Sequence, residues 1–194
     1  MFLGFVDLHT GYIIFHLLGV VLGAGGAFMS DAMFFSSAKD GQISEMEIRF
    51  LKLASRVVWI GIIILVISGA LIFLEDTEKY LNSSKFLAKM TIVGIIILNG
   101  VIFHISHIPF LYRHTNLHMC LSKEVKDRMP GLIVSGVVSM ISWLSALVLG
   151  SLKTVPYSYF VIMGFYLAVL ALGISFALLF KKYILPAGYQ KIKR

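Results

Sequence analysis

Five long apolar runs, separated by shorter stretches that hold most of the polar residues, dominate the pattern of the chain. The runs lie at about residues 11–35, 57–74, 86–108, 131–151 and 158–180. As an α-helix rises about 1.5 Å per residue, each run is long enough to cross roughly 30 Å of hydrocarbon. The pattern predicts an all-α membrane protein, a single domain over residues 1–194 built as a bundle of five transmembrane helices.

Composition and charge agree with this class and predict an orientation. Hydrophobic residues make up 58% of the chain and charged residues only 14%, with a mean hydropathy of +0.89. Thirteen of the 17 Lys and Arg residues lie in the first and third connections or after the last run. The positive-inside rule then predicts an N-terminus outside and a C-terminus in the cytoplasm, here of a bacterial inner membrane. Anionic lipid at the cytoplasmic face explains the net charge of +7, so no nucleic acid is needed as a partner.

Small and polar residues follow one face of the first run. His16, Gly19, Gly23, Gly26 and Ser30 recur at steps of three and four, which is the spacing of one helix face. One interpretation is a helix-packing face of the G-x-x-x-G type, with the histidine hydrogen-bonded across the interface. The other is a groove of bare backbone against which a flat macrocycle lies, while His16 ligates its metal. The first run alone leaves both interpretations open.

Helix depth sorts the ionisable residues of the runs into two clusters. The outer cluster contains His16 and Lys89, with Met90 as a candidate thioether ligand and Glu75, Asp76 and Glu78 at the nearby surface. The inner cluster lies near the cytoplasmic ends of the first three runs and contains Asp31, Arg56, His104 and His107. We expect His16 and His104 to lie roughly 20 Å apart along the membrane normal, which excludes a haem held between them.

Within the inner cluster, the most economical arrangement is an ion pair between Asp31 and Arg56, because an unpaired charge in the membrane is costly. His104 lies one helical turn deeper than His107 and is therefore the better candidate for chemistry. Outside the runs, Ser44 and Glu47 have the spacing of a capping box that begins an interfacial helix.

A third group of candidate ligands lies in the connection between the third and fourth runs. His114, His118 and Cys120 could ligate zinc, although a fourth ligand is not evident.

The stretches FHLLGVV, RFLKLASR, SGALIFL, FLAKMTIV and FHISH, in this order, carry a family resemblance. Over about residues 8–113 the chain resembles the HemJ-type membrane protoporphyrinogen oxidases and the related CopD-like membrane domains. In that family a histidine of the first span ligates haem b, and a lysine that opens the third span is needed for activity. The resemblance assigns these roles to His16 and Lys89.

These observations lead us to expect a redox protein that binds haem b noncovalently between the first three spans. His16 would be the axial ligand, the glycines would allow close approach, and Lys89 would pair with a propionate or an anionic porphyrin. Lys89 and His104 are the candidate catalytic residues. The expected partners are membrane lipid, a quinone or a porphyrin, and a second copy of the chain. The alternatives are a protein that handles or transports copper or another metal ion, and a sensor or assembly factor without a cofactor.

Overall fold

The computed structural model describes residues 7–40, 43–115 and 123–180. Within these ranges the regular structure is helical and contains no strand. The helices, in chain order, are α1 (Leu8–Asp40), α2 (Glu45–Glu75), α3 (Thr77–Leu81), α4 (Ser84–Ile102), the π-helical turn η1 (Phe103–His107), α5 (Ile108–Arg113), α6 (Lys123–Ser151) and α7 (Tyr159–Leu179).

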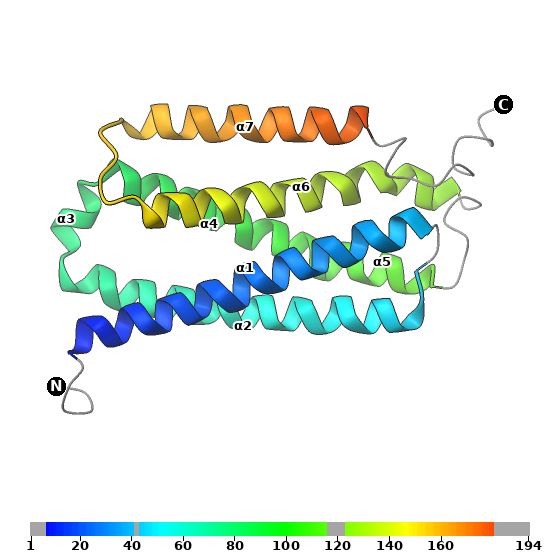
Figure 1. Ribbon diagram of the computed structural model, residues 1–194, viewed down its shortest axis with the longest axis horizontal. Helices are drawn as coiled ribbons and strands as arrows, with labels where there is room; N and C mark the ends of the chain where they lie inside the picture. The colour runs from blue at the N-terminus through cyan, green and yellow to red at the C-terminus, as the bar shows by residue number, and fades with distance from the viewer. Residues whose placement is uncertain (1–6, 41–42, 116–122, 181–194) are drawn as a thin grey trace.

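Five helical segments of this part of the chain are long and apolar enough to cross a membrane, as the sequence predicts. Four are α1, α2, α6 and α7, and α4, η1 and α5 together form the fifth. Successive segments lie in alternating directions along the long axis of the molecule (Figure 1), which gives the bundle an α3 end and an α5 end. These features support a multi-pass membrane protein.

The second span begins at the predicted capping box. The Ser44 hydroxyl accepts a hydrogen bond from the backbone N–H of Glu47, and the Glu47 carboxylate accepts one from the backbone N–H of Ser44. Two otherwise unpaired N–H groups of the helix start are satisfied in this way. The Ser37 hydroxyl of α1 also donates to Glu47 over 2.6 Å, so the cap connects the two helices. From this cap, α2 continues without interruption to Glu75.

Pro109 explains the π-helical turn inside the third span. A proline has no N–H to donate, and its ring clashes with the carbonyl four residues earlier, here that of Ile105. The chain accommodates the ring by widening one turn, so that the N–H of Ile108 bonds to the carbonyl of Phe103, five residues back. The widened turn contains both His104 and His107.

The closest helix pair of the bundle is formed by α1 and α2. In Figure 1, α1 and α2 lie side by side along one edge of the bundle, and α7 lies along the opposite edge next to α6. Gly61 of α2 has space for no side chain, because an added Cβ would lie 2.8 Å from the Gly19 carbonyl oxygen and from Gly23 Cα. Close backbone approach of this kind drives helix association in lipid, where apolar burial contributes little.

Candidate functional sites

The glycine stripe of α1 packs against other helices, which corrects the expectation of an open groove for a macrocycle. A Cβ on Gly19 would lie 2.9 Å from the backbone nitrogen of Leu65, and one on Gly26 would lie 3.0 Å from the Val58 side chain. A Cβ on Gly23 would overlap the indole ring of Trp143. The stripe is therefore the helix-packing face of the first interpretation, because α2 and α6 occupy the space that the macrocycle would need.

His16 is held in one orientation by α2. Its Nδ1 lies 3.1 Å from Ser68 Oγ, and its ring also interacts with the backbone of Leu65. Since the Ser68 hydroxyl donates its single proton to the Ile64 carbonyl over 2.6 Å, Ser68 accepts from His16, which makes Nδ1 the protonated nitrogen. Within the described residues, Nε2 has no hydrogen bond and is not among the fully buried unpaired atoms. Nε2 is therefore unbonded and not fully buried.

Lys89 lies close enough to His16 to interact with it electrostatically, as the depth argument predicts. It is half-buried, and its ammonium group approaches the end of α6, 3.8 Å from the position of a Cβ on Gly150. Lys85 lies beside it and donates to the Leu152 carbonyl over 2.7 Å. Both cations are therefore placed at the negative end of the α6 dipole. Met90 is 50% exposed on the surface of α4, which places its thioether on the lipid side.

The prediction of an ion pair between Asp31 and Arg56 is wrong. Asp31 is only 9% exposed, and its Oδ2 has no hydrogen-bond partner among the described residues. The Ser139 hydroxyl of α6 lies close enough to the Asp31 carboxyl group to interact with it. Arg56 lies on the exposed side of α2. The two residues diverge because Asp31 faces α6 across the bundle, which the depth argument could not predict.

Asp31 lines a partly open cavity of about 50 Å³ between α1, α2, α4, η1 and α6. Two reciprocal hydrogen bonds cross the α4–α6 contact here, from the Asn99 amide to the Ser135 carbonyl over 3.1 Å and from the Ser135 hydroxyl to Asn99 Oδ1 over 2.9 Å. The lining of the described residues is part polar and part aromatic, and consists of Ala27, Ser30, Asp31, Ser55, Val58, Trp59, Ile96, Asn99, Gly100, Phe103, Ser135, Ser139 and Trp143.

Of the two inner histidines, His104 is the one connected to this cavity. Its Nδ1 lies 3.0 Å from the hydroxyl of Ser55, which is a lining residue, while the rest of the imidazole is exposed. His107 is buried against Phe103 and has an unpaired Nδ1.

Because Ser68 and Ser55 are 13 residues apart on α2, their partners His16 and His104 lie roughly 20 Å apart along the helix, as expected.

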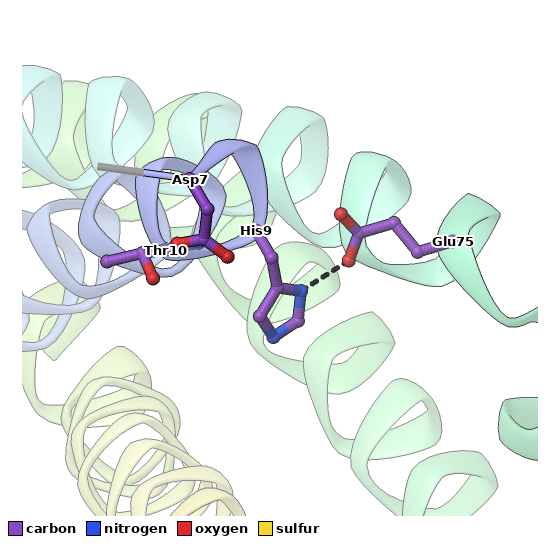
Figure 2. A network of polar contacts seen from close by, with 4 residues as sticks. All are labelled: Asp7, His9, Thr10 and Glu75. Atoms are coloured by element: carbon purple, nitrogen blue, oxygen red, sulfur yellow. Dashed lines mark hydrogen bonds and ion pairs between the residues drawn. The ribbon is translucent and has the colours of Figure 1, made fainter. Parts of the chain in front are cut away.

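Sequence reasoning missed an ion pair at the α3 end. Figure 2 shows His9, at the start of α1, reaching Glu75 at the end of α2, where its Nδ1 contacts the carboxylate. In the same view Asp7 lies beside Thr10 and accepts its backbone N–H. Hydrogen bonds from the Thr10 hydroxyl and N–H lower the pKa of the exposed Asp7 carboxyl. The sequence contained a signal for this pair, since His9 lies two helical turns before His16 on the same face and Glu75 was expected at the surface near His16.

The candidate zinc ligands are not assembled within the described residues. His114 donates from Nδ1 to the Phe110 carbonyl over 2.9 Å, and its Nε2 lies 3.4 Å from a carboxylate oxygen of Glu124. His118 and Cys120 lie outside the described residues. In the described part of the chain, no three His, Cys, Asp or Glu side chains are grouped so that they could hold a metal ion.

Comparison of the chain with protein-family models, with curated proteins and with solved structures gave no match.

Proposed function

We propose that this protein is a membrane redox protein that binds haem b noncovalently, with His16 as an axial ligand. One observation carries the proposal: an imidazole inside the apolar part of the bundle is fixed through Nδ1 and has an unbonded Nε2 that is not fully buried. A histidine that ligates a metal commonly donates its other ring N–H to a neighbouring group, which fixes its tautomer and orientation. Ser68 is that neighbour here.

The His16 imidazole is a donor that suits haem iron, but α2 and α6 fill the space along the glycine stripe, so a haem bound at Nε2 would lie on the side of His16 that faces away from Ser68. A neutral imidazole is the common axial ligand of b-type haem, and the haem supplies one-electron redox chemistry when it is bound. Lys89 provides a positive charge near His16 to which a propionate or an anionic porphyrin can bind. The proposed partner is a quinone or a porphyrinogen that reaches the site from the lipid.

His104 is not part of the same centre in this proposal, because it lies roughly 20 Å from His16 along α2. We assign it to the polar cavity at the other end of the bundle. The orientation that we propose puts the α5 end in the cytoplasm of a bacterial cell. Arg49, Lys52, Arg56, Arg113 and Lys123 lie at that end, on α2, α5 and α6, in agreement with the positive-inside rule.

The test is a reduced-minus-oxidised absorbance spectrum of the protein purified from haem-replete cells. We expect a haem Soret band in the wild type and its loss in His16→Ala. His9→Ala is the matched control, since it removes a second histidine from the same face of α1, and it should keep the band. A flat wild-type spectrum, or a band that survives in His16→Ala, would refute the proposal. In the flat case, a loss of stability in His16→Ala would favour a sensor or assembly factor in which His16 serves only helix packing.

Ser68→Ala separates orientation of the imidazole from ligation. The variant keeps Nε2 but loses the acceptor of the Nδ1 proton, so we expect haem to bind about 10- to 100-fold more weakly. The affinity can be measured by titrating the haem-free protein with haemin. Unchanged affinity would mean that Ser68 has only a packing role.

A further inference from the structure

Two residues that line the cavity, Asp31 and its neighbour Ser30, each have a buried oxygen without a hydrogen-bond partner among the described residues, and they lie about 15 residues along α1 from His16. Asp31 Oδ2 and Ser30 Oγ are both buried, with their residues 9% and 5% exposed, and neither has a hydrogen-bond partner within the described residues. A buried carboxylate without a partner is costly, and buried polar groups are normally paired. The protein atoms alone therefore leave this site incomplete.

The residues that line the cavity indicate which kind of ligand would pair with the Asp31 carboxylate. Asp31 is the only ionisable residue among the described residues that line the cavity, so a single positive charge balances it. The remaining polar groups are the hydroxyls of Ser30, Ser55, Ser135 and Ser139 and the amide of Asn99, with no sulfur or imidazole. Oxygen donors suit hard cations rather than copper or zinc.

The size and the aromatic walls agree with this class of ligand. A cavity of about 50 Å³ holds one small ion with a few waters, since a single water needs roughly 10–15 Å³. It is far too small for an organic cofactor. The indole rings of Trp59 and Trp143 form part of the wall, and aromatic faces attract cations. His104 and Ser55 provide a polar connection from the exposed surface to the cavity.

We propose that this cavity binds one monovalent metal cation of the size of Na⁺, with the Asp31 carboxylate as its charged ligand. The hydroxyls of Ser30 and Ser139, which also line the cavity, are the neutral ligands that we assign: Ser30 Oγ has no hydrogen-bond partner among the described residues, and Ser139 interacts with Asp31. Intramembrane carboxylates of this kind mark ion paths in membrane proteins. The site is independent of the proposed haem function.

The chain contains its own probe for this site, because both of its tryptophans line the cavity. Na⁺ is titrated into the purified protein at constant ionic strength, with N-methylglucamine chloride as the replacement salt, and the tryptophan fluorescence is recorded. We expect a saturable change in the wild type. Asp31→Asn should weaken Na⁺ binding about tenfold or more, because it removes the only charged ligand.

Ser139→Ala and Ser145→Ala form a matched pair that tests the site even when Asp31→Asn fails to fold. Both remove a hydroxyl from α6, but only Ser139 lines the cavity. We expect weaker Na⁺ binding in Ser139→Ala and wild-type binding in Ser145→Ala. The proposal is overturned if wild-type fluorescence does not respond to Na⁺, if it responds to pH but not to Na⁺, K⁺ or Li⁺, or if Asp31→Asn binds Na⁺ as the wild type does.

Discussion

Replacement of Gly61 by alanine tests the closest contact of the bundle. An added Cβ would lie 2.8 Å from the Gly19 carbonyl oxygen and from Gly23 Cα, and even closer to Gly23 N. These are backbone atoms, so no side chain can rotate away. Ordinary contact begins at 3.4 Å, so α1 and α2 must separate by more than about 0.6 Å, because the contact with Gly23 N is closer than the other two.

The expected loss of stability follows from two opposing terms. Overpacking of this kind costs about 3 kcal/mol, the upper part of its usual range, because rigid backbone blocks the added methyl group. The higher helix propensity of alanine returns about 1 kcal/mol. We expect Gly61→Ala to lower the free energy of unfolding by about 2 kcal/mol.

Gly94→Ala on α4 is the control for this prediction. It makes the same chemical change in a helix at a position where nothing lies within 4 Å, so its stability should equal or slightly exceed that of the wild type. Both variants can be compared by reversible SDS-induced unfolding in lipid–detergent micelles, followed by circular dichroism. Equal unfolding free energies for the two variants would show that the α1–α2 contact is not as close as described.

Two further predictions concern polar contacts at opposite ends of the bundle. Ser44→Ala should lower the free energy of unfolding by about 1 kcal/mol, because it removes the hydroxyl that caps α2; an unchanged thermal midpoint would contradict the capping box. A double-mutant cycle on His9 and Glu75 should give a coupling energy below about 1 kcal/mol that decreases with added salt, because the side chains are 49% and 33% exposed. A coupling that is large and independent of salt would mean that the pair is buried.

The fold was largely readable from local patterns. Each predicted span corresponds to a helix of the structure, and the capping box of Ser44 and Glu47 forms as expected. The helices extend beyond the apolar runs at prolines: α6 begins at Lys123 and includes Pro130, whereas the apolar run begins at about residue 131. Near Pro109 the third span widens by one π-helical turn instead of ending. A proline restricts its own turn, but the neighbouring packing decides whether the helix continues.

Only part of the candidate sites could be predicted from the sequence, and the reason is geometrical. Depth follows from sequence position at about 1.5 Å per residue, so the proximity of Lys89 to His16 and the distance from His16 to His104 could be predicted. The direction in which a side chain faces around the bundle depends on how the helices are arranged, and that arrangement turns Asp31 away from Arg56.

By itself, then, the sequence determined that the chain is helical, where its five apolar segments lie and at what depth each polar residue is found. Periodic burial of apolar side chains and the fixed rise of a helix are local properties, which is why they can be read along the chain. Only the tertiary structure decided that the glycines of α1 pack against α2 and α6, and that Asp31 faces a cavity with an unpaired oxygen. Both features depend on contacts between helices that are distant in sequence. The periodicity of one helix shows which of its faces is packed, but it does not show which other helix packs against that face.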